Sequence, residues 1–416
     1  MNPLDPAYAI IGALTAPVWA RKARGGWSER MGRVAPGTVA PKARPRVLLH
    51  AVSVGEASAL RTLVPLLAES TDVIVSATTD TGIARARALY SDIATVVRYP
   101  LDFSGSVRKF LDTVQPDAVA LTELELWPNF LGACTKRNIP VGVINGRLSA
   151  RSFANYRRFR PLVGPMFRKL AFAAVQDGAY AQRFREMGVP DDRCTITGSM
   201  KWDNARVTDE VDGADELAAA LGLDRSRPIV VAGSTGPGEE ALLYERFTAE
   251  RPDVQLVCAP RKPERFDEAA AALPGCVRRS ETKGAPAGAS LFLLDSIGEL
   301  STLYAVADVV VIGRSFFDLY GSDPTEPIGL GKATVIGPAV GDFESIVGAF
   351  EAGGGIVRAT RDDVGEVIGG LLADPDRRAE IAGLGREVIR GHQGASERHA
   401  EILMRLVAPG AHSGAV

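Results

Sequence analysis

The chain has 416 residues, of which 46% are hydrophobic and 24% are charged, a balance that is ordinary for a globular protein. This length exceeds what one hydrophobic core usually supports and predicts two domains. The formal net charge of -2 gives no support for nucleic-acid binding, and the four scattered cysteines favour reduced, buried thiols over disulfides or a thiol metal site.

The amino terminus begins with an apolar segment, residues 7–20, which is too short to span a bilayer. Arg21, Lys22 and Arg24 follow it directly, whereas a secretory signal peptide places its basic residues before the apolar part. The pattern favours an amphipathic anchor on an anionic membrane surface, and a helix packed on the core is the alternative. We predict a membrane-associating segment over residues 1–45.

Residues 46–208 alternate apolar runs with helical segments such as Ser104–Val114, which predicts a domain built on a parallel sheet with helices on both faces. The predicted strands are Val47–Val52, Val73–Ala77, Thr95–Tyr99, Ala118–Thr122, Val141–Asn145, Phe172–Gln176 and Cys194–Gly198.

The acidic segment Asp209–Asp215 predicts a linker, after which the alternation resumes and predicts a second domain over residues 216–408. Its predicted strands are Ile229–Ala232, Val254–Ala259, Ser290–Leu294, Val309–Ile312, Thr334–Ile336 and Ile356–Ala359. We expect the tail after Pro409 to be disordered. Neither half carries G-x-G-x-x-G after its first strand, and the four histidines form no metal-ligand cluster, so we expect no cofactor and no metal.

The first predicted strand ends in His50–Glu56, a run of small residues that delivers the carboxylate of Glu56 at the start of a helix. Open α/β sheets bind ligands at the carboxyl ends of their strands. The helix dipole favours the ionised form of a carboxylate there, so Glu56 could act as a general base. A glutamate that only caps the helix is the alternative.

Two further strand ends direct polar residues to the same edge, namely Glu123 and Glu125 after one strand and Arg147 and Ser149 after another. A basic segment with interspersed aromatic residues follows, and it suits either the phosphates of an acceptor or a solvated helix face. No RNA-binding motif accompanies it. Its cations are Arg147, Arg151, Arg157, Arg158, Arg160, Arg168 and Lys169.

In the second half, the loop Gly233–Glu240 could hold an anion through its N–H groups and the hydroxyls of Ser234 and Thr235, or it could be a capped turn. Arg261 and Lys262 could bind a phosphate and a carboxylate, or they could be solvated charges.

Motifs in order along nearly the whole chain resemble those of the Kdo (3-deoxy-D-manno-octulosonic acid) transferases of lipopolysaccharide synthesis. They lie at His50–Glu56, Glu125–Asn129, Asn145–Ser149, Thr197–Asp203, Ala232–Glu240, Pro260–Phe266, Gly298–Leu300 and Pro324–Pro327. The family usually has histidine where Lys262 stands, and histidine and asparagine where Ser322 and Asp323 stand.

The resemblance implies a GT-B glycosyltransferase with two Rossmann-like, doubly wound domains facing across a cleft. It implies inverting, metal-independent transfer of Kdo from CMP-Kdo to a lipid A precursor, at the cytoplasmic face of the bacterial inner membrane, by a peripheral or amino-terminally anchored enzyme. Glu56 would be the base. The acceptor-binding residues would be Ser53, Gly55, Glu123, Glu125, Arg147 and Ser149. The donor-binding residues would be Ser234, Thr235, Arg261, Lys262, Ile297, Gly298, Glu299, Asp323 and Glu326.

Two alternatives remain open. One is a related GT-B nucleotide-sugar transferase or epimerase that uses UDP sugars. The other is a weakly active, membrane-associated GT-B binding protein. The replaced residues of the donor loop, Ser322 and Asp323, favour this alternative.

Overall fold

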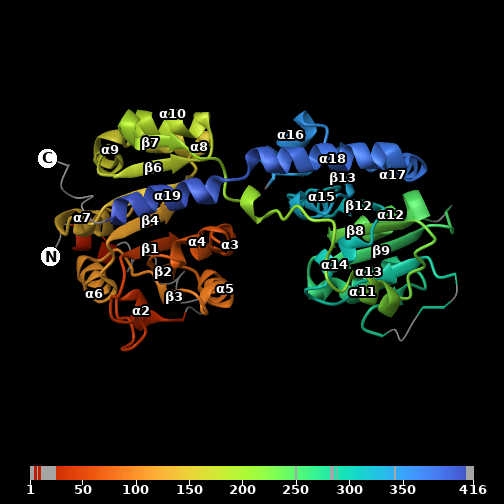
Figure 1. Ribbon diagram of the computed structural model, residues 1–416, viewed down its shortest axis with the longest axis horizontal. Helices are drawn as coiled ribbons and strands as arrows, with labels where there is room; N and C mark the ends of the chain where they lie inside the picture. Colours follow the sequence, from red (N-terminus) through yellow and green to blue (C-terminus); the bar gives the residue numbers. More distant parts are fainter. Residues whose placement is uncertain are drawn as a thin grey trace. The chain divides into compact units, whose positions relative to one another are not determined.

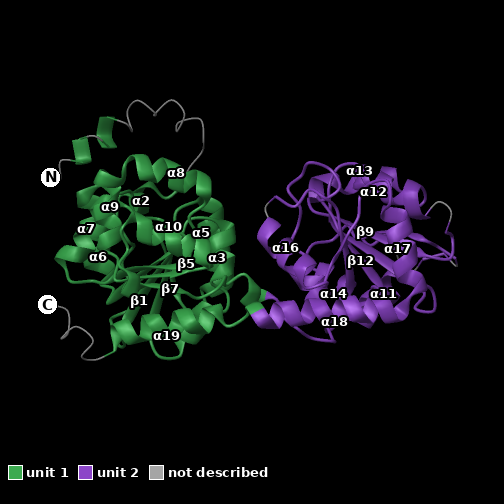
Figure 2. Cartoon of the chain, turned by 90° about the horizontal axis from the view of Figure 1, so that it is seen from above, with its two compact units in different colours: residues 1–204, 392–416 green, residues 205–391 purple. Residues whose placement is uncertain are grey.

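The structure is a computed structural model that describes residues 4–6, 8–10, 25–248, 251–281, 285–286, 288–341 and 343–408. Two compact units divide the chain, and Figure 2 colours them separately. Unit 1 comprises residues 1–204 together with 392–416, and unit 2 comprises residues 205–391. Of the expected anchor, residues 7–20, only residues 8–10 are described, and there the Tyr8 hydroxyl donates to Asp102 at 3.0 Å. The rest of the expected anchor and the expected disordered tail after Pro409 fall outside the described residues.

The unit boundaries differ from those we expect from the sequence in two ways. The final helix α19 (Ala395–Val407) belongs to unit 1, because Ala395, Ala400 and Leu403 are buried in a core cluster of that unit. The expected linker Asp209–Asp215 lies inside unit 2, where Asp209 forms an ion pair of 2.6 Å with Arg386.

Unit 1 contains a seven-stranded parallel sheet in the order β3-β2-β1-β4-β5-β6-β7 (Figure 1). Near-continuous apolar strands of this kind are buried on both faces. The order reverses between β1 and β4, which defines the switch point at which such sheets bind ligands. The strands are β1 (Arg46–Ala51), β2 (Asp72–Ala77), β3 (Thr95–Arg98), β4 (Ala118–Thr122), β5 (Val141–Gly146), β6 (Phe172–Val175) and β7 (Cys194–Ile196).

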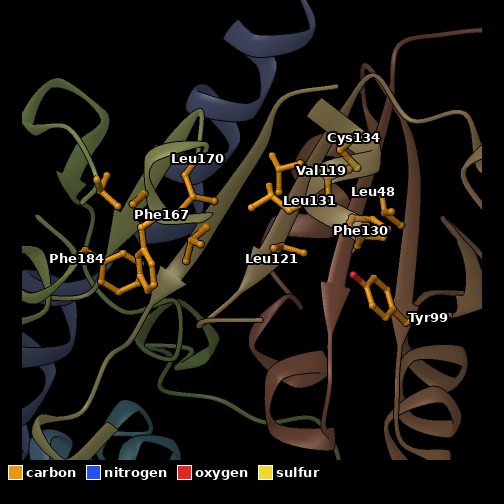
Figure 3. Packing of buried hydrophobic residues seen from close by; sticks show 14 of the residues in the cluster. Leu48, Tyr99, Val119, Leu121, Phe130, Leu131, Cys134, Phe167, Leu170 and Phe184 are labelled. Carbon is orange, nitrogen blue, oxygen red and sulfur yellow. The ribbon is translucent and has the colours of Figure 1, made fainter. Parts of the chain in front are cut away.

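Helices cover both faces of this sheet, as the alternating sequence pattern predicts. Successive residues of β1 enter different core clusters: Leu48 packs in one, and Val47 and Leu49 pack in the other. Figure 3 shows the first cluster, in which Tyr99 and Phe130 lie with ring centroids 5.0 Å apart. The helices are α2 (Trp27–Arg30), α3 (Val54–Ala59), α4 (Leu63–Ala68), α5 (Asp80–Tyr90), α6 (Ser104–Val114), α7 (Pro128–Lys136), α8 (Ala150–Arg158), α9 (Arg160–Arg168), α10 (Gly178–Met187) and α19, with 3-10 turns at Asp191–Arg193 and Trp202–Asn204.

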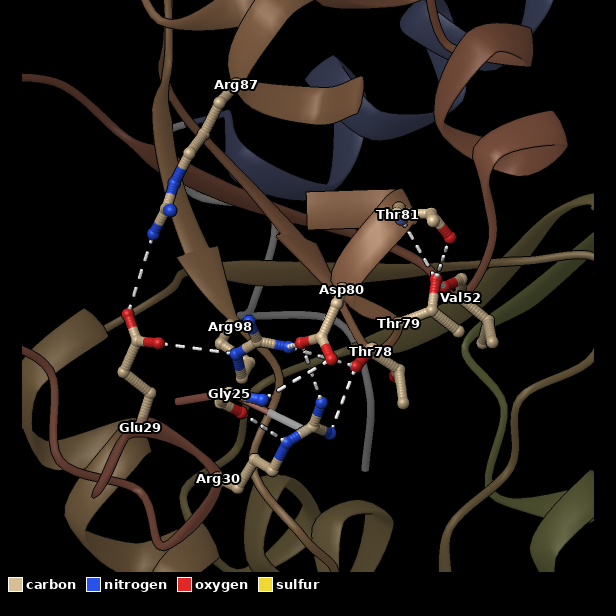
Figure 4. Close-up of polar contacts among 11 residues, drawn as sticks. Gly25, Glu29, Arg30, Val52, Thr78, Thr79, Asp80, Thr81, Arg87 and Arg98 are labelled. Atoms are coloured by element: carbon tan, nitrogen blue, oxygen red, sulfur yellow. Dashed lines mark hydrogen bonds and ion pairs between the residues drawn. The ribbon is translucent and has the colours of Figure 1, made fainter. Parts of the chain in front are cut away.

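A cluster of charged residues fastens α2 to the loop that follows β2 (Figure 4). Asp80 lies 3.1 Å from Arg30 and 2.8 Å from Arg98, and both arginine side chains are buried. Arg98 also pairs with Glu29 at 3.3 Å. Although burial opposes it, Arg98, the Gly25 amide and Arg30 together hold the pKa of Asp80 below its usual range. The cluster therefore fixes the start of α5, next to the β1 strand end.

Unit 2 contains a second parallel sheet of seven strands, in the order β10-β11-β9-β8-β12-β13-β14, with its switch point between β8 and β12. β10 is absent from the sequence prediction because Val277 is followed directly by Arg278 and Arg279, so no apolar run marks it. The strands are β8 (Ile229–Thr235), β9 (Gln255–Pro260), β10 (Val277–Arg278), β11 (Leu291–Leu293), β12 (Val309–Ile312), β13 (Ala333–Ile336) and β14 (Val357–Arg358). The helices are α11 (Ala214–Leu221), α12 (Glu239–Leu243), α13 (Phe266–Ala272), α14 (Leu300–Ala305), α15 (Thr325–Gly329), α16 (Glu344–Ala352), α17 (Val364–Ala373) and α18 (Pro375–His392), with a π turn at Tyr244–Thr248 and a 3-10 turn at Pro263–Arg265.

Candidate active site

Glu56 lies in the first turn of α3, directly beyond the carboxyl end of β1. Its Oε2 accepts a hydrogen bond from the Val52 amide at 2.8 Å, and its Oε1 accepts one from the Ser53 hydroxyl at 2.9 Å. Ser53 in turn caps the helix by accepting from the Glu56 amide. This is a reciprocal cap, so the capping role that the sequence left open is present in the structure. Each carboxylate oxygen of Glu56 accepts one of these hydrogen bonds and keeps a second lone pair. The carboxylate can therefore still accept a proton.

Burial raises the pKa of Glu56, and Glu123 raises it further, while the Val52 amide and the Ser53 hydroxyl lower it. Burial likewise raises the pKa of Glu125 to about 7, where Trp127 opposes the shift and Glu56 and Glu123 add to it. The Trp127 indole N–H donates to Glu125 at 3.1 Å. Three carboxylates thus share one site, and their mutual repulsion favours uptake of a proton.

Glu123 adopts a left-handed backbone conformation, with φ of 61°. This conformation is uncommon for a residue with a side chain and costs of order 1 kcal/mol. The Glu123 amide donates to the Ile144 carbonyl at 3.0 Å, which holds the end of β4 against the end of β5. The turn therefore orients two glutamates at the switch point.

A pocket at this edge of the sheet brings together four of the predicted residues, Glu56, Glu123, Glu125 and Arg147. Its other lining residues are Leu124, Leu148, Ser152 and Tyr156. One cation and three carboxylates suit an acceptor that offers several hydroxyl groups together with an anionic group.

The three other predicted acceptor-side residues do not line this pocket. Ser53 and Ser149 cap α3 and α8. Gly55 is exposed, and a Cβ there would meet only Ser53 Oγ, at 3.9 Å. Glycine is therefore not required for packing at position 55. The sequence prediction omitted Ser152 and Tyr156, although Ser152, Tyr156, Phe159 and Val163 follow a helical spacing that could have indicated them.

A second, apolar pocket shares Ser152 and Tyr156 with the first and runs along α8 and α9. No residue of α8 is buried. Phe159 is 60% exposed and Leu162 is 76% exposed, and both line the apolar pocket. All the cations of the basic segment are exposed, and Arg158 and Arg160 adjoin the pocket-lining residue Phe159 in the sequence. The site in unit 1 therefore consists of a carboxylate-rich pocket and an adjoining apolar groove, which share Ser152 and Tyr156.

His399 of α19 supports the end of β5, just before Arg147. The Asn145 amide donates to His399 Nε2 at 2.9 Å, and His399 Nδ1 lies 2.5 Å from the Ala395 carbonyl. Burial lowers the pKa of His399, so its ring stays neutral and Nε2 stays an acceptor. Asn145 is itself left-handed, with φ of 51°. Helix α19 thus fixes the strand end that precedes Arg147.

In unit 2, the loop after β8 is held by the buried carboxylate of Glu239, and no side chain caps the start of α12 at Gly238. Glu239 accepts hydrogen bonds from the amides of Gly236, Arg314, Ser315 and Phe316, at 2.6–3.0 Å. Of the loop Gly233–Glu240, in which the sequence suggested amides that could hold an anion, the Gly236 amide is therefore occupied by the protein's own carboxylate.

The hydroxyls of the two predicted residues in this loop differ. Thr235 donates to Glu240 at 2.6 Å, and Glu240 also pairs with the buried Arg265 at 3.1 Å. The Ser234 side chain has no hydrogen bond to a described residue, and its backbone is left-handed with φ of 57°. Of the two hydroxyls, only that of Ser234 is available to a ligand.

Two exposed cations, Arg261 and Lys262, follow β9. Neither side chain forms an ion pair or hydrogen bond with any described residue. The loop is anchored through its backbone, since the Arg261 amide donates to the Thr235 carbonyl at 3.0 Å. Both cations are therefore free to meet an anion.

The other predicted donor-side residues lie on neighbouring loops. Ile297 is 72% exposed, Gly298 has φ of 96°, and Glu299 pairs with Arg279 at 3.2 Å. The helix α14 starts only at Leu300 and is six residues long, so Ile297 and Gly298 lie in the loop before it. Asp323 accepts from the Thr325 amide at 2.9 Å, and Glu326 is exposed in the first turn of α15.

Among the described residues, no group of three or more His, Cys, Asp or Glu side chains is arranged to hold a metal ion. Within the same part of the chain, none of the helices combines the length and the apolar character that a membrane span requires.

Comparisons with known proteins place the chain in a family. A family profile described as 3-Deoxy-D-manno-octulosonic-acid transferase (kdotransferase) matches residues 25–204. A 3-deoxy-D-manno-octulosonic acid transferase of Bordetella pertussis is 33% identical over 415 residues, covering 92% of this chain and 93% of the relative. A transferase of the same name from Haemophilus influenzae is 30% identical over 369 residues, covering 86% of each chain.

A solved structure shares the fold. UDP-GlcNAc 2-epimerase from Neisseria meningitidis matches with a TM-score of 0.58 and 15% identity, covering 86% of this chain and 100% of the other. The predicted doubly wound GT-B fold is thereby confirmed. The resemblance seen in the motifs is confirmed as well: the chain belongs to the Kdo transferase family and is a glycosyltransferase.

Proposed function

We propose that this chain is an inverting transferase that moves Kdo from CMP-Kdo to a lipid A precursor, with Glu56 as the general base. The observation that carries the proposal is the position of Glu56, a carboxylate of raised pKa in a pocket at the switch point of a Kdo transferase family member. A base whose pKa is raised toward the working pH accepts a proton efficiently.

In the proposed reaction, a hydroxyl of the acceptor sugar gives its proton to the Glu56 carboxylate. The hydroxyl oxygen forms a bond to the anomeric carbon of Kdo from the side opposite to CMP. The bond between that carbon and the phosphate oxygen breaks, and CMP leaves with the electron pair. Arg147 and the carboxylates Glu123 and Glu125 orient the acceptor in the pocket.

On the donor side, Arg261 and Lys262 meet the phosphate and the Kdo carboxylate. Both cations are exposed and have no partner among the described residues. Positive charge there stabilises the negative charge that develops on the phosphate as CMP leaves. Glu326 accepts hydrogen bonds from the ribose hydroxyls, for which an exposed carboxylate is suited.

The lipid part of the acceptor fits the groove along α8 and α9. Acyl chains match the exposed side chains of Phe159 and Leu162, and lipid phosphates match the surrounding arginines. The same surface suits attachment to the anionic cytoplasmic face of the inner membrane, where each nearby cation contributes about 1 kcal/mol. Residues 7–20 would add an amphipathic anchor.

The transfer reaction is tested by incubating the full-length protein with CMP-Kdo and a tetra-acylated lipid A precursor and measuring the product mass. We expect the precursor to gain Kdo. Turnover of a UDP sugar instead would support the transferase or epimerase alternative. Binding of CMP-Kdo without any product would indicate a weakly active binding protein.

Membrane attachment is tested by sedimentation with vesicles that contain anionic lipids. We expect a Phe159→Ser, Leu162→Ser double variant and a variant lacking residues 1–24 each to bind less than wild type, and salt to weaken binding by screening the cations. Wild-type binding in both variants would refute this part of the proposal.

A further inference from the structure

Tyr304 of α14 places a hydroxyl group in unit 2 that the structure leaves unused. The residue is only 3% exposed, and its hydroxyl has no hydrogen bond to any described residue. The ring is buried, but the hydroxyl oxygen is not one of the fully buried side-chain atoms that lack a partner, so it keeps some exposure to solvent. A hydroxyl that has no protein partner and reaches solvent is accessible to a ligand.

The hydroxyl lies at the carboxyl end of β8, against Gly233. A Cβ atom at Gly233 would lie 1.9 Å from Tyr304 Oη, so any side chain there would exclude the hydroxyl. The next residue, Ser234, turns the chain into a left-handed conformation, and its own hydroxyl also lacks a described partner. A glycine followed by this turn thus opens the strand end to the tyrosine oxygen.

Three of the predicted donor-side residues are close enough to the Tyr304 hydroxyl to shift its pKa. Burial raises the pKa of Tyr304, the carboxylates of Glu326 and Asp323 raise it further, and Arg261 opposes them. The hydroxyl therefore keeps its proton at all physiological pH values and acts as a hydrogen-bond donor. Because the ring is buried, it is not available to stack on a nucleobase.

We propose that the Tyr304 hydroxyl donates a hydrogen bond to the phosphate of the nucleoside monophosphate part of the donor, beside Arg261. This inference rests on the proposed function, which supplies a CMP-linked donor. A tyrosine hydroxyl and a guanidinium are both donors, and a phosphate oxygen is an acceptor. The two nearby carboxylates, by contrast, suit the hydroxyl groups of the ribose.

The test uses the Tyr304→Phe variant of the full-length chain, with binding of CMP and of cytidine measured by calorimetry. We expect CMP affinity to fall roughly 10- to 100-fold, the usual worth of a hydrogen bond to a charged group. Cytidine lacks the phosphate, so its affinity should not change. The melting temperature of the ligand-free variant should equal or exceed that of wild type, because no hydrogen bond within the protein is lost.

Tyr244→Phe is the matched control, since it removes the same atom from another tyrosine of unit 2, in the π turn after α12. It should bind CMP as wild type does. Wild-type CMP affinity in Tyr304→Phe, equal losses for CMP and cytidine, or a lowered melting temperature without ligand would each overturn the inference. Failure of the wild-type protein to bind CMP would instead overturn the proposed donor, and the inference with it.

Discussion

Replacing Glu56 by glutamine separates its role as a base from its role as a cap. In the wild-type protein, the Glu56 carboxylate accepts hydrogen bonds from the Val52 amide at 2.8 Å and from the Ser53 hydroxyl at 2.9 Å. The glutamine carbonyl can keep one of these bonds, and its NH₂ group cannot accept the other. The loss is about 1.5–3 kcal/mol at most, and it is partly offset because a neutral amide is less costly to bury than a charge. Since domains are typically stable by about 5–15 kcal/mol, the variant should fold.

The catalytic effect of the same change should be much larger. An amide cannot take the proton of the acceptor hydroxyl, so we expect turnover to fall by about 10²–10⁴-fold, the usual worth of general-base catalysis. The assay is Kdo transfer at saturating donor and acceptor, with melting temperature and CMP affinity measured on the same preparations.

Asp177→Asn is the matched control for this experiment. Asp177 also joins a strand to a helix in unit 1, where it caps α10 by accepting from the Tyr180 amide at 2.8 Å, and it does not line the carboxylate pocket. Because asparagine and aspartate cap helices about equally well, the variant should keep nearly all of its stability and retain turnover within about twofold of wild type. Glu56→Gln turnover as high as that of this control would refute the assignment of Glu56 as the base.

Three further predictions follow from the same contacts. Glu123→Gln removes a charge that raises the pKa of Glu56, so the acid limb of the pH–rate profile should move to lower pH; an unmoved limb would contradict the shared-carboxylate argument. Arg261→Ala should weaken CMP binding roughly 10- to 100-fold, and Glu326→Ala by a smaller factor, by calorimetry; unchanged affinities would exclude this site. Burial lowers the pKa of His50 to about 3, below the unfolded value near 6.5, so the unfolded state binds more protons between these values. The free energy of unfolding should therefore fall by up to about 1.4 kcal/mol per pH unit below pH 6.5, measured by tryptophan fluorescence, which reports unit 1 because all four tryptophans belong to it.

The sheets were accessible to sequence analysis because parallel strands buried on both faces form apolar runs that polar loops interrupt. Helix α6 has the predicted bounds, Ser104–Val114. The strand β10 was not accessible, because Val277 is followed directly by Arg278 and Arg279 and no apolar run marks the strand. The unit to which α19 belongs was not accessible either, since an amphipathic pattern shows that a helix packs but not on which core.

The sequence predicted which residues gather where the ends of neighbouring strands meet. It did not predict which hydrogen-bond partners the polar groups of a loop have. Glu56, Glu123 and Glu125 gather because β1 and β4 are neighbours at the switch point. The loop after β8 shows the limit, because a glycine-rich turn looks the same in sequence whether the Gly236 amide faces a ligand or the carboxylate of Glu239. The role proposed for Tyr304 could not be predicted from the sequence, because a tyrosine in an apolar helix is usually a core residue.

The return of α19 to unit 1 makes unit 2 an insertion within unit 1, with consequences for how the chain is made. During synthesis, the sheet of unit 1 emerges nearly 190 residues before the helix that covers one of its faces. That apolar face of the sheet therefore stays uncovered until α19 has been synthesised. Asp203 accepts from the amides of Gly394 and Ser396 at 2.8 and 2.6 Å, so the two points at which the insertion begins and ends are adjacent. Joining residue 204 to residue 392 through a short glycine linker should therefore yield unit 1 alone, whereas truncation after residue 204 should yield an aggregating fragment.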